Sequence, residues 1–146
     1  MGKNKRNRLA SLTREFVGKQ YELGNNDCFI VIYKYLQLRG LPLPRLYKGQ
    51  TLRTYAELFL KDPHGAKELM VDFIDNTLKR LKGPNYSTAG DILFLRPKSV
   101  YLAPAALGID CGNGNVMIVT EKHGVNIAPL NRYEIVRGWT CQLRDQ

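Results

Sequence analysis

The residue most able to do chemistry in this chain is Cys28, which directly follows the polar segment Gly24-Asn25-Asn26-Asp27. An apolar run from Phe29 to Tyr33 comes next and predicts that the cysteine begins a buried helix, capped by Asn26 or Asp27. The first turn of a helix carries unpaired backbone N–H groups and the positive end of the helix dipole, and both favour a thiolate. Cys28 is therefore the candidate nucleophile of a cysteine hydrolase.

A thiol nucleophile needs a base, usually an imidazole, and the chain has two histidines. His64 follows Asp62-Pro63 at a predicted helix start, where a surface position is expected. His123 lies in a predicted hairpin turn, where histidines are usually solvated, and we retain it as the alternative base for Cys28. With neither histidine in an expected place, a buried and inert thiol at Cys28 is the favoured interpretation.

The elements that must position Cys28 change in character along the chain. Helical periodicity dominates the first half, and short apolar strands separated by Gly, Asn and Pro turns dominate the second. An antiparallel meander after helices predicts an α+β domain. The expected helices cover about residues 8–19, 27–38, 51–60 and 62–81, and the expected strands cover about 92–95, 106–111, 116–120, 125–128 and 135–139.

Three groups of residues follow one another in an order that is known from a peptidase family. They are Asn26-Asp27-Cys28, then Gly90-Asp91-Ile92-Leu93-Phe94, then Leu107-Gly108-Ile109 with Gly112-Asn113-Gly114-Asn115-Val116. In this order they resemble the motifs of NlpC-type papain-like cysteine peptidases over roughly residues 20–140. The resemblance implies a papain-like fold with N-terminal helices packed on a four- to five-stranded antiparallel sheet. Residues 1–19 would form a basic arm and first helix, and residues 20–146 a single domain.

The chain departs from this family where the catalytic base belongs. The resemblance places the family's histidine at Ala106, opposite Cys28, and the group that orients it near Met117 or Ile118. Alanine can neither accept nor return a proton. Of the three catalytic positions that the resemblance implies, only Cys28 carries over, so we expect a degenerate and non-catalytic scaffold.

The end of the chain resembles a short branch of the same family that phage tail modules encode. The resemblance rests on Val125 to Leu130 and on Arg137-Gly138-Trp139. It implies a phage or prophage protein that is made in the host cytoplasm and then resides in the virion tail. The implied partners are other virion or tail proteins, and a ring of copies is one assembly that we consider.

The net charge of +9 predicts an acidic partner. Many of the positive charges lie in the N-terminal arm, where we expect Lys3, Lys5, Arg6 and Arg8 to bind DNA or an acidic protein. The chain has eight tyrosines, and those at helical spacing are interpreted as core and interface anchors and not as stacking platforms, because no basic strand interleaves with them.

No cofactor or metal is expected, because the three cysteines lack metal-site spacing, and no membrane-spanning run is found. Three function classes remain open. The first is a structural or interaction component of a phage virion, which the resemblance places in the tail or tail tip. The second is an active cysteine hydrolase that cleaves cell-wall peptides during phage entry. The third is a basic nucleic-acid-binding module.

Overall fold

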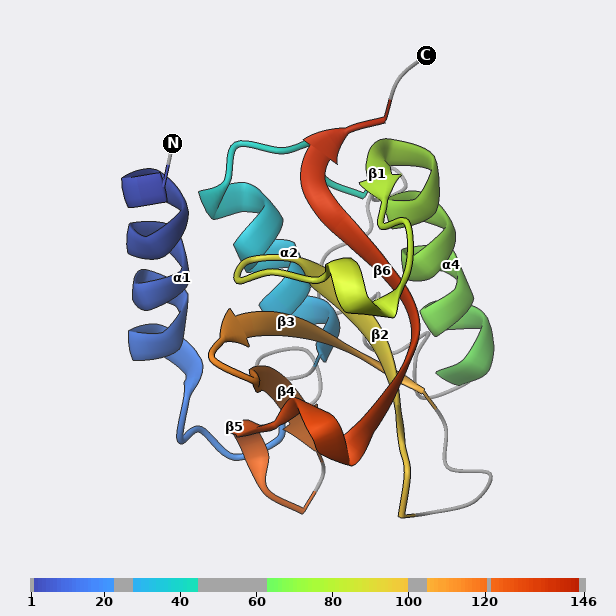
Figure 1. Ribbon diagram of the computed structural model, residues 1–146. Helices are drawn as coiled ribbons and strands as arrows, with labels where there is room; N and C mark the ends of the chain where they lie inside the picture. The colour runs from blue at the N-terminus through green and yellow to red at the C-terminus, as the bar shows by residue number, and fades with distance from the viewer. Residues whose placement is uncertain (1, 23–27, 45–62, 100–104, 121, 145–146) are drawn as a thin grey trace, which may run out of the picture.

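The computed structural model of this chain describes residues 2–22, 28–44, 63–99, 105–120 and 122–144, with the side chains of residues 2–7 and 63–69 left aside. The described helices are α1 (Gly2–Phe16), α2 (Cys28–Leu38) and α4 (Pro63–Thr77), with short 3-10 turns η1 (Pro84–Tyr86) and η2 (Leu130–Arg132). The described strands are β1 (Leu78–Arg80), β2 (Ile92–Pro97), β3 (Ala106–Gly112), β4 (Asn115–Thr120), β5 (Gly124–Pro129) and β6 (Tyr133–Leu143). The α+β class predicted from the sequence is confirmed (Figure 1).

The six strands form one antiparallel sheet in the order β1-β6-β2-β3-β4-β5. The expectation of four or five strands was wrong, because it placed Leu78–Arg80 in the preceding helix. That helix ends at Thr77, and the next three residues pair with the end of β6. Leu78 is buried in β1, and an apolar residue at this position is equally compatible with the expected helix, so its hydrophobicity could not distinguish a helix from a strand. The strand conformation is set by pairing with β6, which is distant in the sequence.

The side chains of the sheet alternate between two separate cores. In β2, Ile92 and Phe94 pack with helical residues, whereas Leu93 and Leu95 pack on the opposite side. We call the first set the helix-side core; its fully or nearly fully buried members include Leu12, Phe16, Phe29, Ile32, Tyr35, Ile74, Ile109, Met117 and Trp139. We call the second set the outer core; its buried members are Leu93, Leu95, Val116, Ile118 and Ala128.

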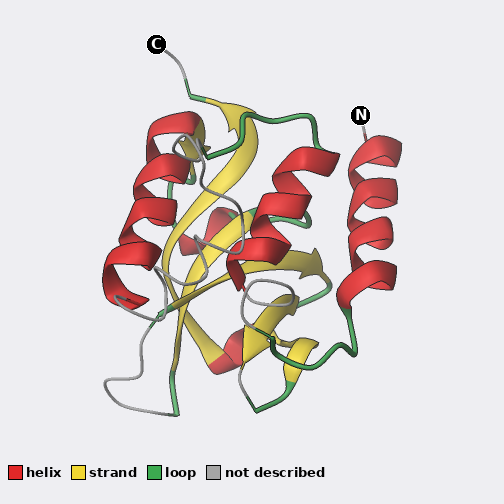
Figure 2. Cartoon of the chain, turned by 180° about the vertical axis from the view of Figure 1, so that it is seen from behind, coloured by secondary structure: helices red, strands yellow, loops and turns green. Residues whose placement is uncertain are grey.

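All three described helices cover the same face of the sheet (Figure 2). The helix α2 lies closest to the centre, and six of its residues are buried. It ends as predicted before Gly40, whose φ of +67° is the left-handed conformation that commonly closes a helix. Because α1 contributes Leu12 and Phe16 to the helix-side core, the first helix packs in the same core as α2 and the sheet.

The predicted hairpin between β3 and β4 is confirmed. Asn113 and Gly114 have φ values of +55° and +78°, which suit the two-residue turn that matches the twist of antiparallel strands. The last strand is longer than expected and runs over Tyr133–Leu143. The expected helix over 51–60 and the expected cap at Asn26 or Asp27 lie outside the described residues.

Candidate functional site

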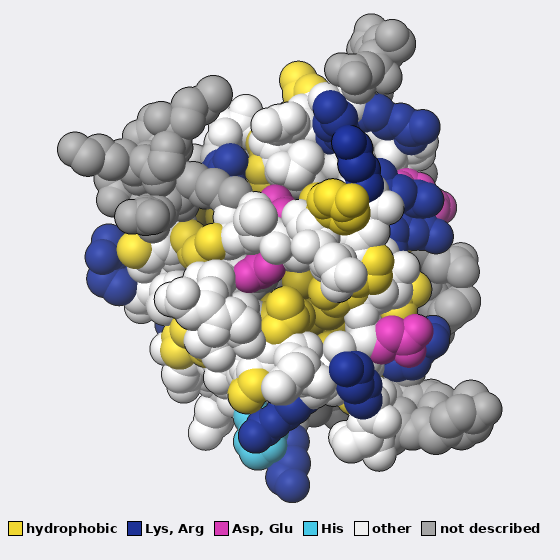
Figure 3. All heavy atoms as spheres, in the orientation of Figure 1, with side chains coloured by type: hydrophobic (Ala, Val, Ile, Leu, Met, Phe, Trp, Pro, Cys, Tyr) yellow, Lys and Arg dark blue, Asp and Glu magenta, His cyan; other side chains and the backbone are white. Residues whose placement is uncertain are grey.

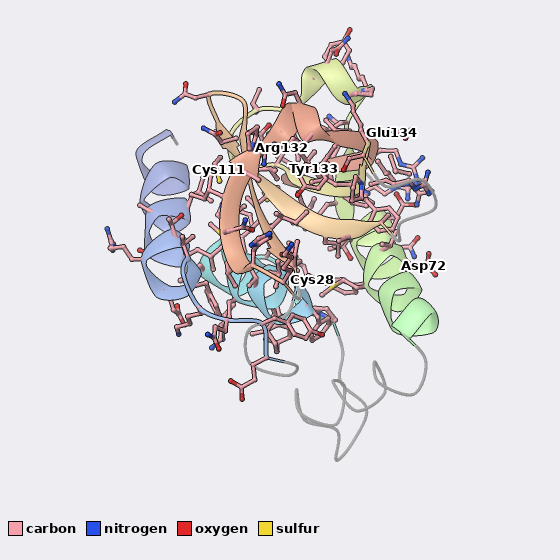
Figure 4. The ribbon with its side chains drawn as sticks, turned by 90° about the horizontal axis from the view of Figure 1, so that it is seen from below. Cys28, Asp72, Cys111, Arg132, Tyr133 and Glu134 are labelled. Carbon is pink, nitrogen blue, oxygen red and sulfur yellow. The ribbon has the colours of Figure 1, made fainter. Side chains whose placement is uncertain are left out.

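Cys28 is the first described residue of α2 and is partly buried against the helix-side core. Figure 4 shows it at the end of α2, on the helix-covered side of the sheet. Phe29, the next residue, is 5% exposed and packs its ring 5.9 Å from that of Tyr33. The thiol thus lies at a helix N-terminus, as predicted from the local sequence. Toward the protein interior, Cys28 packs against the apolar side chains of the helix-side core.

The positions that the resemblance assigns to the catalytic base and its orienting group are filled by packed apolar side chains. Ala106 opens β3 and packs against the outer core, whereas Cys28 packs against the helix-side core. Met117 and Ile118 are 1% and 3% exposed, and each belongs to a different core. The structure therefore places Ala106 on the other face of the sheet from Cys28, and not opposite it.

His123, the alternative base, lies at the turn between β4 and β5 and is exposed. Its backbone N–H donates a hydrogen bond to Thr120 Oγ1 at 3.1 Å, which stabilises the turn. His64 is the second residue of α4, and its side chain lies outside the described part of the chain. The turn position predicted for His123 is confirmed, whereas a role as base stays a prediction.

The other two cysteines flank the start of β2. Cys111 is in β3, and burial together with the nearby Asp110 raises the pKa of its thiol to about 11, although a hydrogen bond from the Met117 backbone opposes this shift. Cys141 is in β6 and donates to the Gly90 carbonyl at 3.4 Å. A thiol with a raised pKa is a poor nucleophile at neutral pH. Cys111 therefore behaves as a core residue.

The Gly90-Asp91 motif has a structural role that the described contacts explain. The Tyr35 hydroxyl of α2 donates to the Gly90 carbonyl at 2.7 Å, which ties the central helix to the sheet. Asp91 accepts the Thr88 backbone N–H at 2.9 Å, and the neighbouring Asp110 accepts the Ser87 hydroxyl at 2.6 Å. These two buried carboxylates hold the turn that leads into β2, and this hydrogen-bonding role accounts for their burial.

The best-organised charged site was not predicted, and it is centred on Asp75 of α4. The Asp75 carboxylate accepts hydrogen bonds from Trp139 Nε1 at 3.0 Å and from Arg80 Nη2 at 2.8 Å, and Arg137 Nη1 lies 3.6 Å away. Burial alone would raise the pKa of Asp75, but the hydrogen bonds from Trp139 and Arg80 and the charges of Arg80 and Arg137 lower it below its ordinary value. Asp75 and Trp139 are 64 residues apart, so no local pattern could have linked them.

The basic arm predicted to bind DNA or an acidic partner lies in the first turns of α1. Arg8 is exposed, while the side chains of Lys3, Lys5 and Arg6 lie outside the described part of the chain. Binding by these four residues stays a prediction. Within the described residues, no group of three or more histidine, cysteine, aspartate or glutamate side chains could hold a metal ion. No helix in that part of the chain is long and apolar enough to cross a membrane.

Comparison with known families gives one match. Residues 3–141 match the model of a family described as a domain of unknown function, DUF6950. The match covers the described helices except Gly2, the first residue of α1, and nearly the whole sheet. No curated protein matches the sequence.

Proposed function

The chain belongs to the DUF6950 family, and we propose that it is a non-catalytic structural or interaction protein of a phage virion, in the tail or its tip. In this proposal the scaffold is a papain-like fold of NlpC type that keeps the helix-borne cysteine and has lost the catalytic base. The phage assignment comes from the sequence resemblance.

One observation carries the non-catalytic part of the proposal. Ala106, at the position of the expected base, packs into the outer core, and Cys28 packs against the helix-side core on the opposite face of the sheet. A general base must lie within hydrogen-bond reach of the proton that it abstracts. Even a histidine introduced at position 106 would have to cross the sheet to meet the Cys28 thiol, so a single substitution does not restore a catalytic pair.

The first test measures peptidoglycan digestion by the purified full chain, with an active peptidoglycan hydrolase as positive control. We expect no release of cell-wall peptides from the chain, from Cys28→Ala or from His123→Gln, because an alanine stands at the position expected for the catalytic base. We also expect the Cys28 thiol to react slowly with iodoacetamide at pH 6. Digestion that disappears in both variants would show an active hydrolase that uses His123 and would overturn the proposal.

The second test asks where the chain resides, by mass spectrometry of purified, nuclease-treated particles of the phage that encodes it. We expect the chain to be present with the tail proteins and in a fixed ratio to them. The matched control is a non-virion protein from the same phage, which should be lost on purification. If the chain is lost with that control, a virion role is contradicted.

A further inference from the structure

The structure contains a basic edge strand that was not expected, β1, and it changes how the exposed Tyr86 is interpreted. Lys79 and Arg80 of β1 are exposed and pair with Thr140 and Trp139 of β6. From the sequence, Lys79 and Arg80 were expected in a helix over residues 62–81, and for that reason no basic strand was predicted beside a tyrosine. The strand brings two cations to the edge of the sheet beside β6, which contains Arg137 and is followed by Arg144.

Three further cations join this edge, and we call the set the basic corner: Lys79, Arg80, Lys82, Arg137 and Arg144. Arg144 follows β6, and its backbone N–H donates to the Thr77 carbonyl at 2.8 Å, immediately before β1. Asp75 forms ion pairs with Arg80 at 2.8 Å and with Arg137 at 3.6 Å. Among the described residues, Asp75 is the carboxylate that forms ion pairs with the basic corner, and its one negative charge leaves most of the five positive charges unbalanced.

A hollow and an exposed aromatic ring lie beside the basic corner. The hollow has a volume of about 240 Å³ and is lined by residues of the β1–η1 segment, among them Arg80 and Gly83, and by residues 135–138 of β6. Tyr86 of η1 is 63% exposed, and its ring lies next to Gly83, where an added Cβ would be 3.7 Å from Tyr86 Cδ2. Figure 3 shows that Lys and Arg side chains gather at the upper right of this face, beside exposed apolar atoms.

We propose that the basic corner and Tyr86 form a binding surface for single-stranded nucleic acid, in which the cations contact phosphates and the Tyr86 ring stacks on a base. Surfaces that bind single strands without reading their sequence combine these two elements, a positive groove and an aromatic platform. The exposed lysines on both sides of Arg80 favour this ligand over a protein partner, because lysine is depleted at protein interfaces. The proposal does not depend on the virion role.

The test measures binding of a fluorescent 12-mer of oligo-dT to the full chain by polarisation, at several salt concentrations. We expect Lys79→Gln/Lys82→Gln to weaken binding about tenfold at low salt and to reduce the salt slope. The matched control, Lys98→Gln/Lys122→Gln, removes the same charge from two exposed positions elsewhere and should change affinity less than about twofold. We expect Tyr86→Ala to weaken binding about fivefold or more, and Tyr86→Phe to retain binding.

Three outcomes would overturn this assignment. An equal loss in the two double variants would show binding by net charge alone. A preference for duplex over single strands, with no effect of Tyr86→Ala, would refute stacking. Tighter binding of a poly-glutamate peptide than of oligo-dT would indicate an acidic protein partner. Repeating the Tyr86 comparison with Lys3, Lys5, Arg6 and Arg8 changed to Gln separates this surface from the basic arm, because the Tyr86 effect should persist.

Discussion

Two sites of this molecule, the N-terminal end of α2 with Cys28 and the contact between α4 and β6 with Asp75, differ in the side chains that surround them. Apolar side chains dominate the first site, and hydrogen-bonded polar side chains dominate the second. Cys28 has the sequence context of a nucleophile, yet the positions expected to serve it hold apolar side chains in two separate cores. Asp75 has no recognisable motif, yet it accepts hydrogen bonds from a buried tryptophan and an arginine. The comparison teaches that a motif marks where chemistry could occur, whereas hydrogen-bond partners mark which polar groups the fold organises.

The largest effect should come from removing Trp139, which is fully buried and links the helix-side core to Asp75. We expect Trp139→Ala to lower the free energy of unfolding by about 3–5 kcal/mol, because it leaves a large cavity and removes one of the hydrogen bonds that Asp75 accepts. Trp139→Phe keeps most of the volume and should cost about 1–2 kcal/mol. Guanidinium unfolding measures both, and equal losses would show that the hydrogen bond, and not the packing, dominates.

A smaller and pH-dependent effect is expected for Asp75→Asn. The folded state lowers the pKa of Asp75 below its ordinary 3.8, so its ionised form stabilises the fold above that pH, and this contribution is lost as the pH falls through the folded pKa. Unfolding at pH 7 should show a loss of about 1–2 kcal/mol for the variant. The gap between wild type and variant should shrink below pH 3.8.

The control for this pH dependence is Asp72→Asn, an exposed carboxylate on the same helix (Figure 4). It should change the unfolding free energy by less than about 0.5 kcal/mol. A pH-independent loss in Asp75→Asn, or an equal loss in Asp72→Asn, would contradict the role given to the hydrogen bonds and ion pairs of Asp75.

The parts of this fold that depend on neighbouring residues could be predicted, and the parts that depend on distant pairing could not. The apolar run after Cys28 and the Asn113-Gly114 turn carry their own signals, and both were placed correctly. The β1 strand was missed because only its pairing with β6 distinguishes it from the end of α4.

The candidate site divides in the same way. Cys28 was placed at a helix start by its local sequence. The sequence could not show that Ala106 lies on the opposite face of the sheet from Cys28. The face on which each β3 side chain lies depends on strand register and on which face the helices cover, and neither is a local property. The Asp75–Trp139 hydrogen bond joins residues far apart in the chain, and so it leaves no periodic trace in the sequence.

The smallest effect, and the one that most directly separates the two interpretations of Cys28, is expected for Cys28→Ala. The side chain is small and partly exposed against an apolar core, so its removal should lower the free energy of unfolding by about 0.5–1 kcal/mol. Catalytic residues are often held at a cost in stability, and replacing them commonly stabilises the protein. The two accounts therefore predict opposite signs for the change in the free energy of unfolding caused by Cys28→Ala. Chemical denaturation of wild type and Cys28→Ala measures this change, with Cys141→Ala, which removes another half-buried thiol, as the matched control. A gain in stability confined to Cys28→Ala would indicate a nucleophile held for chemistry, whereas similar small losses in both variants fit a thiol that serves packing.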